Sequence, residues 1–118
     1  MKYMMLIYFA EGAIDEVERE HCYDESAHLI SEIDSRGQFH GAAPLHPVST
    51  ATSVRVRDGK KLITDGPFAE TREQLGGYYL VDTKDLDEAI GIAARIPGAR
   101  YGTVEVRPVI ELSGRPQE

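Results

Sequence analysis

The stretch YMMLIYFA at residues 3–10 constrains the fold of this chain more than any other feature. Both of its alternating sets of residues are apolar, with Met5 and Ile7 in one set and Met4 and Leu6 in the other. A strand with one face in water alternates between apolar and polar residues, whereas a strand that is covered on both faces does not. The segment therefore predicts a central strand of a sheet that is covered on both sides.

Two segments with helical periodicity supply a cover for one of those sides. Residues 15–36 and 85–98 repeat apolar or small side chains at spacings of three and four, and Gly37 is a suitable end for the first helix. Asp85 and Glu88 resemble a capping box at the start of the second helix. The positions that define the two stripes are Cys22, Ser26, Leu29 and Ile33, then Leu86, Ala89, Ile90 and Ala93.

The remaining segments predict strands. Residues 53–64 predict a hairpin around Asp58-Gly59, residues 76–83 predict a second strand with two apolar faces, and residues 103–112 alternate cleanly. With a short extended piece near residue 39, the order is β-α-(β)-β-β-β-α-β. We therefore expect residues 1–118 to form a single α+β domain, a ferredoxin-like sandwich with an antiparallel sheet and two helices on one face.

Two helices cover only one face of such a sheet. The other face would then be a large exposed apolar patch, which soluble monomers rarely tolerate. The sequence therefore predicts a homodimer that forms through the open face of the sheet.

Charge and composition exclude several classes of protein. The chain of 118 residues has a net charge of −7, which would repel a nucleic-acid backbone. The single Cys22 cannot form an internal disulfide, and the apolar start is too short for a membrane span and lacks a cleavage site. We therefore expect a cytoplasmic protein that binds neither nucleic acid nor membrane.

The stretch ITDGPFAETREQLGGYYL at residues 63–80 holds most of the candidate site residues. Asp65 precedes a Gly-Pro turn, where a carboxylate either caps the turn or acts as a general base or substrate anchor. Phe68 either packs on the core and fixes the turn, the commoner role for such a ring, or forms the wall of a pocket. Glu70 and Arg72 are either solvated or bind an anionic ligand, with Glu70 orienting the planar guanidinium group.

A second set of candidates lies in the strands. Glu105 and Arg107 share one face of their strand, either as an ion pair at a dimer interface or as the polar floor of a pocket between two sheets. Tyr79 or Tyr78, whichever shares that face, would add a hydroxyl group. The pair Gly76-Gly77 permits a bulge or the close approach of another backbone or a ligand.

The histidines are weaker candidates. His40 is close to a proline-containing loop and could act as a general base, although loop histidines are more often simply exposed. His21, Glu25 and His28 are spaced as one face of a helix, but a solvated acidic face is favoured over a metal site because no fourth ligand is indicated. No metal and no cofactor are predicted, and Cys22 is expected to be a buried, unreactive thiol.

Two long stretches, residues 50–82 and 86–109, together with the opening MKYMMLIY, resemble the YCII-related family in the subgroup named after its Asp-Gly-Pro-Phe signature. The resemblance implies a ferredoxin-like fold of the dimeric α+β barrel kind. Members of this subgroup are often encoded beside sigma factors of the extracytoplasmic-function type, which implies a regulatory link. Other YCII-like proteins carry a histidine and an aspartate proposed as a catalytic pair. His28 is the nearest positional counterpart of that histidine, and Asp65 and His28 are the candidate catalytic residues here.

Two classes of function remain open on the sequence. The first is a protein that binds an unknown small molecule near the Asp-Gly-Pro-Phe turn, with metal-independent acid–base chemistry of the lyase or isomerase kind if it is an enzyme. The second is a non-catalytic partner protein that acts near a sigma factor through the acidic segment 11–34. The first is favoured, because a protein-binding surface does not require a turn of this composition.

Overall fold

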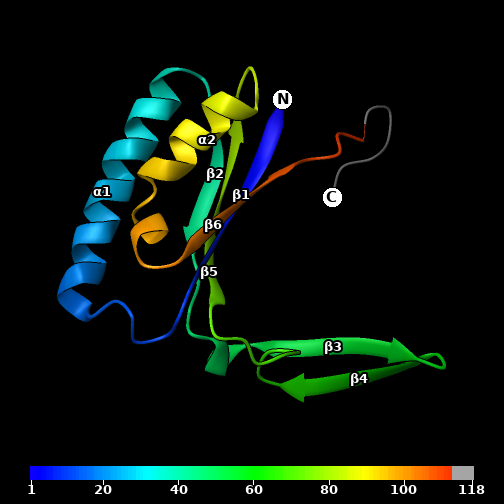
Figure 1. Ribbon diagram of the computed structural model, residues 1–118. Coiled ribbons are helices and arrows are strands. Elements are labelled where there is room, and N and C mark those ends of the chain that lie inside the picture. The colour runs from blue at the N-terminus through cyan, green and yellow to red at the C-terminus, as the bar shows by residue number, and fades with distance from the viewer. Residues whose placement is uncertain (113–118) are drawn as a thin grey trace.

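The computed structural model describes residues 1–112 and shows a four-stranded antiparallel sheet with two helices on one face (Figure 1). Helix α1 connects β1 to β2, and helix α2 connects β5 to β6, which gives the split β-α-β arrangement of the ferredoxin-like fold. The predicted fold class is therefore confirmed. In spatial order the sheet contains β2 (Phe39–Pro44), β5 (Gln74–Asp82), β1 (Lys2–Phe9) and β6 (Thr103–Pro108), and the helices are α1 (Glu16–Ser35) and α2 (Leu86–Arg95).

Strand β1 is central, as its composition predicts. It pairs with β5 on one side and with β6 on the other. One alternating set, which includes Met5 at 0% exposure, is buried under the helices, whereas Met4 and Leu6 in the other set are only half-buried. Within one chain, the helices thus cover one apolar face and leave the second face open.

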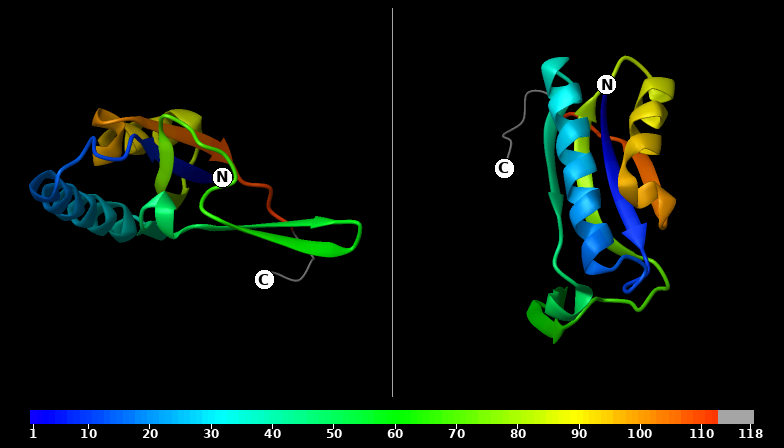
Figure 2. Two further views of the ribbon diagram at one scale, coloured as in Figure 1. Left: turned by 90° about the horizontal axis from the view of Figure 1, so that it is seen from below. Right: turned by 90° about the vertical axis from the view of Figure 1, so that its left-hand side faces the viewer.

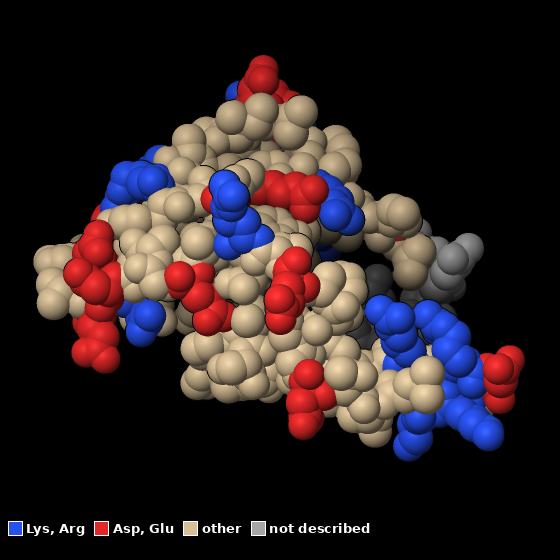
Figure 3. Space-filling view, turned by 60° about the horizontal axis from the view of Figure 1, so that its bottom comes forward, with Lys and Arg blue, Asp and Glu red and all other residues tan. Residues whose placement is uncertain are grey.

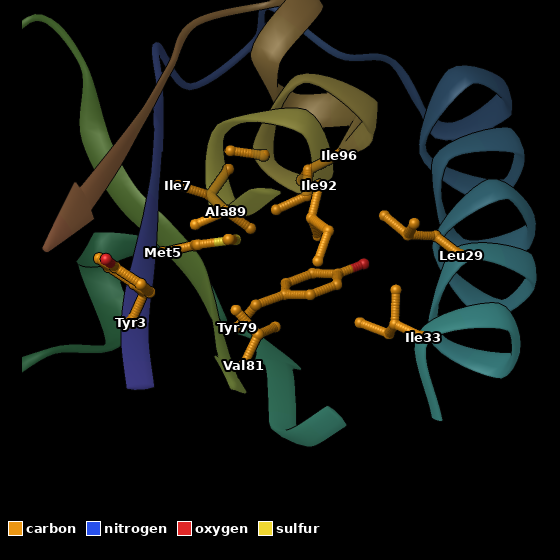
Figure 4. Close-up of a cluster of buried hydrophobic side chains, with 11 residues drawn as sticks. Tyr3, Met5, Ile7, Leu29, Ile33, Tyr79, Val81, Ala89, Ile92 and Ile96 are labelled. Carbon is orange, nitrogen blue, oxygen red and sulfur yellow. The ribbon is translucent and has the colours of Figure 1, made fainter. Parts of the chain in front are cut away.

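The core lies between the helices and the covered face of the sheet (Figure 4). Its side chains come from β1, β5, α1 and α2, and from Ile96, which lies between α2 and the short helix η2 (Pro97–Arg100). Met5, Ile33, Val81 and Ile96 are among the largest side chains that are completely buried. This packing fixes α1 across the sheet, and the position of α1 determines where a cavity can form.

The ends of the helices follow from local sequence signals. Asp15 caps α1 by accepting a hydrogen bond from the backbone N–H of Glu18 at 2.8 Å, and the Glu18 side chain accepts one from the Asp15 backbone, which completes a capping box. Gly37 ends α1 with φ of 72°, in the left-handed conformation that glycine adopts readily. Neither described helix is long and apolar enough to cross a membrane.

The predicted stripe of the second helix is partly wrong. Leu86 and Ile90 are half-exposed, and the buried face of α2 consists of Ala89, Ile92 and Ala93, continued by Ile96. Ala89 and Ala93 belong to both the predicted and the observed stripe, so the prediction is displaced around the helix by about a quarter of a turn. Apolar residues occur on both sides of Ala89 and Ala93, and periodicity alone does not decide between them.

The hairpin forms a separate two-stranded ribbon and does not join the main sheet. Strands β3 (Thr52–Arg57) and β4 (Lys60–Asp65) pair only with each other. Asp58 and Gly59 both have positive φ, 52° and 72°, which gives the two-residue turn that matches the twist of a hairpin. We call residues 52–65 the arm. It projects away from the helices, past the open face of the sheet (Figure 1, Figure 2).

Two ion pairs join α1 to the second half of the chain. The guanidinium group of Arg100 binds both carboxylate oxygens of Glu25, at 2.7 and 3.0 Å, and Arg95 binds Glu32 in the same bidentate way. The hydrogen bond from Arg100 is the main reason that the pKa of Glu25 lies below its ordinary value. These pairs link α1 to η2 and α2 at the surface.

We predict that a side chain at Gly102 destabilises the fold. A Cβ atom at this position would collide with the backbone of Tyr8 and Phe9, which cannot move without breaking β1. Gly102→Ala should lower the free energy of unfolding by about 1–3 kcal/mol. Gly91→Ala is the matched control, because its Cβ would meet open space on the exposed side of α2 and should raise stability by about 0.5–1 kcal/mol. If urea denaturation gave equal changes in the free energy of unfolding for Gly102→Ala and Gly91→Ala, the result would contradict this account.

We also predict a pH dependence at the Glu25–Arg100 pair. A carboxyl group whose folded-state pKa is lowered contributes stability that is fully present above its unfolded-state pKa, near 4.3 for glutamate, and is lost as the pH falls through the folded-state value. Glu25→Gln should therefore reduce the steepness with which the melting temperature falls on acidification. Melting curves of the wild type and this variant that run parallel across the acidic range would refute the prediction.

Candidate functional site

A cavity of about 520 Å³ lies between α1 and the covered face of the sheet. Pockets that bind small molecules commonly have volumes of about 300–1,000 Å³ and apolar walls with a few polar groups. Cys22, Ser26 and Ile30 of α1 form one wall, and Ala42 of β2 lies on the opposite side with Tyr79 of β5. The cavity exists because α1 carries small side chains where it crosses the sheet, so the helix leaves space above β5.

Tyr79 is the most unusual residue of this cavity. Its side chain is only 4% exposed and points from β5 toward α1, between Leu29 and Ile33 (Figure 4). Its hydroxyl group is buried and has no hydrogen-bond partner within ordinary geometry among residues 1–112. Burial raises the pKa of the Tyr79 phenol, and the nearby Ser26 hydroxyl only partly offsets this effect. The phenol therefore stays neutral near pH 7 and offers one donor and one acceptor.

Gln74 contributes a second buried polar atom to the lining. Its side-chain oxygen Oε1 is buried without a hydrogen-bond partner. The pairing of β1 with β5 shifts its register between Ile7 and Tyr8, opposite Gly76, which is the extra residue of a β-bulge. A Cβ at Gly76 would collide with the ring of Phe9. The bulge predicted for the double glycine is therefore present, and it bends β5 beside the cavity where Gln74 lies.

Buried polar groups without partners are rare in native proteins, because each costs about 1–3 kcal/mol. Two residues that carry such atoms, Gln74 and Tyr79, line one cavity here, and both belong to β5. A ligand that hydrogen-bonds to both would remove this cost. The arrangement is therefore typical of a binding site.

The rim of the cavity carries the charged and reactive groups. Glu11 accepts a hydrogen bond from the backbone N–H of Val48 at 2.9 Å and so ties the loop after β1 to the short helix η1 (Val48–Thr50). Arg19 and His46 also contribute to the lining. Partial burial is the largest cause of the raised pKa of the Cys22 thiol, which is the direction opposite to that of an activated cysteine.

The residues of the Asp-Gly-Pro-Phe turn do not line this cavity. Asp65, Glu70 and Arg72 are exposed, and within residues 1–112 no hydrogen bond to the Asp65 carboxylate is found, so the turn cap, one of the two roles considered for Asp65, does not form. The expectation that Phe68 packs on the core is wrong, because its side chain is 79% exposed. The chain leaves the arm at Gly66 with φ of 91°, and this turn directs Phe68 outward.

The strand candidates divide between the two faces of the sheet. Glu105 and Arg107 lie on the open face and contact each other along β6 at 3.3 Å. Leu6 stands opposite both Tyr78 and Glu105 in the sheet, so Tyr78 shares their face, whereas Tyr79 faces the helices. Tyr79 therefore does not belong to the predicted polar floor, which would include Tyr78 instead.

The predicted histidines lie at the surface of the chain. His28 is exposed on α1 and does not line the cavity. His40 is exposed on the edge strand β2, with its Nε2 atom 4.0 Å from Asp82 Oδ2. Across residues 1–112 no three histidine, cysteine or acidic side chains gather in a way that could hold a metal ion, and Glu25, which shares a helix face with His21 and His28, binds Arg100.

Comparisons with known proteins agree with this architecture. The sequence profile of the YCII-related domain family matches residues 1–113. An uncharacterized protein of Rhizobium meliloti (strain 1021) is 43% identical over 75 residues, which cover 62% of this chain. The match spans 60% of that relative's length.

We predict that the Tyr79 hydroxyl contributes nothing to the stability of the unliganded protein. Tyr79→Phe removes a buried group that has no partner, so the free energy of unfolding should stay constant or rise by up to about 1 kcal/mol. Tyr79→Ala should lower it by about 3–5 kcal/mol, because the ring packs in the core. A loss of more than about 1 kcal/mol in Tyr79→Phe would show that the hydroxyl has a partner in the folded chain.

Proposed function

The chain belongs to the YCII-related domain family, and we propose that it binds a small organic molecule in the cavity between α1 and the sheet. The observation that carries this proposal is the hydroxyl group of Tyr79, which is buried without a partner at a cavity of about 520 Å³. A native protein that keeps a buried hydroxyl unpaired, beside a space large enough for a ligand, accepts a cost that binding removes.

The lining defines the chemistry of the ligand. Ile7, Ile30 and Ala42 present apolar surface, which favours a compact hydrocarbon or aromatic ring system. Oε1 of Gln74 accepts hydrogen bonds, and the Tyr79 hydroxyl both donates and accepts them. The ligand class is therefore a mainly apolar ring that carries a hydroxyl or N–H group for Gln74 and a carbonyl or hydroxyl oxygen for Tyr79.

The same hydroxyl suits acid–base chemistry. A buried phenol with a raised pKa remains protonated and donates a hydrogen bond to a carbonyl oxygen as negative charge develops on it. This role requires no metal. Tyr79 thus replaces Asp65 and His28 as the proposed acid–base group of the chain, because those two residues are exposed and do not line the cavity.

The homodimer is part of the proposal. Met4, Leu6 and Leu80 are half-buried on the open face of the sheet, and a second copy that packs on this face would cover them. The alternative function, a regulatory partner of a sigma factor, rests on the resemblance and on the acidic segment 11–34. Glu25 and Glu32 of that segment bind arginines of the same chain, which reduces the acidic surface that a partner could use.

A ligand screen with paired tyrosine variants tests the proposal. Hydroxylated aromatic and alicyclic carbonyl compounds would be screened by ligand-observed NMR, and the dissociation constants of the hits measured by calorimetry. Tyr79→Phe should weaken binding about five- to tenfold, which corresponds to about 1 kcal/mol for one hydrogen bond. Tyr78→Phe is the matched control, because it removes a hydroxyl from the adjacent residue on the opposite face and should leave binding unchanged.

Two further variants test whether the ligand binds in this cavity or at the Asp-Gly-Pro-Phe turn. Ser26→Leu places a larger apolar side chain in the cavity wall and should abolish binding while the fold persists. Asp65→Asn removes a carboxylate outside the lining and should have no effect. Binding that is lost in Asp65→Asn and retained in Tyr79→Phe and Ser26→Leu would move the site to the turn and overturn the proposal.

A further inference from the structure

The arm, residues 52–65, has two chemically different faces. The register pairs Val54 with Ile63 and Val56 with Lys61, so Val54, Val56 and Ile63 share one face. Arg55, Arg57 and Lys60 lie on the other face with Leu62. Val54 is 59% exposed and Ile63 is 64% exposed. One side of the ribbon is thus a mainly apolar surface, with Lys61 near the turn and Asp65 at the base, and residues 1–112 leave it exposed.

The arm also makes the chain unusually extended. A single domain of this length has a radius of gyration of about 13.5 Å, whereas the value here is 16.1 Å. The base of the arm is fixed, because Ser53 Oγ donates to the Gly66 carbonyl at 2.8 Å and Gly66 N–H donates to the Ala51 carbonyl at 2.7 Å. The ribbon therefore projects in a defined direction, away from its own helices (Figure 1, Figure 2).

An isolated two-stranded ribbon is marginally stable in water, because it buries little apolar surface. The arm nevertheless carries three exposed β-branched residues on one face, which suit packing against another surface. Since its own domain lies on the other side of the turn at Gly66, that surface belongs to another molecule.

The charge distribution indicates which molecule covers the apolar face of the arm. The arm holds four basic residues and two acidic residues, a net charge of +2. Since the whole chain has a net charge of −7, the residues outside the arm have a net charge of −9. The basic side chains gather toward the free end of the arm, and acidic side chains are distributed over the body (Figure 3). A second copy of this chain therefore presents a body of opposite charge. The net charge of −9 on the residues outside the arm also repels nucleic acid from the basic end of the arm.

A second copy also presents an apolar surface of matching chemistry. Its open sheet face carries Met4, Leu6 and Leu80. Glu73 lies in an open hollow beside them, together with the Glu105–Arg107 pair. The apolar residues of the arm can pack on Met4, Leu6 and Leu80 of the second copy. The lysines near the free end of the arm can approach the acidic residues in the hollow. In a symmetric pair each copy supplies one arm and receives one, so every contact forms twice.

We propose that the arm of each copy packs with its Val54, Val56 and Ile63 face on a second copy of this chain and that its basic residues neutralise acidic residues of that copy's body. This contact is separate from the cavity and does not depend on ligand binding. It assigns the arm a role as a dimer clasp, in addition to any direct contact between the two sheets.

Adjacent residues on opposite faces of the arm provide the first test. Ile63→Asp places a charge on the apolar face, and Thr64→Asp places the same charge on the other face of the same strand. Sedimentation equilibrium should give about twice the chain mass of 13.1 kDa for the wild type and for Thr64→Asp. Ile63→Asp should weaken association at least about tenfold. Unchanged association in Ile63→Asp, or a monomeric wild type, would overturn the proposal without affecting the cavity.

Carbodiimide cross-linking of mixed copies provides the second test. This reagent joins lysine amines to carboxylates that touch them, and Lys60 and Lys61 lie next to the turn of the arm. In an equal mixture of ¹⁵N-labelled and unlabelled protein, the linked peptides should combine a lysine of one label with a body carboxylate of the other. Links within single copies only would show that the arm folds back on its own body. Absence of any link from these lysines would equally refute the clasp.

Discussion

The pairing of β1 with β5 is the interaction on which the rest of the structure depends. It places Met5 and Val81 on the same buried face, under α1 and α2, and leaves Met4 and Leu80 on the other. A slip of one residue would exchange the two faces, so the burial of Met5 and Val81 also fixes which tyrosine faces the helices. Tyr79 lies beneath α1 for this reason, and its neighbour Tyr78 lies on the open side.

The candidate site follows from this register together with two local irregularities. The bulge at Gly76 bends β5 and brings Gln74 to the cavity, and α1 carries Cys22 and Ser26, small residues, where it crosses the strand. The result is an apolar space with two unpaired polar atoms, a combination that the fold would not need if its purpose were stability alone. The site is built on strands and a helix, which hold the polar atoms in fixed positions.

The sequence predicted the elements whose signals are local. The apolar residues 3–10, the Gly37 stop and the Asp58-Gly59 turn each specify a conformation within a few residues, and the structure confirms the central strand, the helix end and the turn. The cover on the second face of β1 stays a prediction. The location of the site was not predictable in this way. Tyr79 was named as a candidate, but its face depends on pairing between distant segments, and no local pattern shows that a helix will leave space above it. Phe68 illustrates the converse, because an aromatic residue in a turn usually packs inward and this one is exposed.

The central claim is that the Tyr79 hydroxyl acquires a partner when the cavity is filled. The most direct measurement is the NMR spectrum of protein labelled with ¹³C at the tyrosine Cζ atoms, recorded while a screened compound is added. Hydrogen bonding at the phenol oxygen changes the Cζ shift, so the signal of Tyr79 should move in proportion to occupancy while that of Tyr78 stays in place. A signal of Tyr79 that remains fixed at saturation, with movement at Tyr78 or at no tyrosine, would contradict the account.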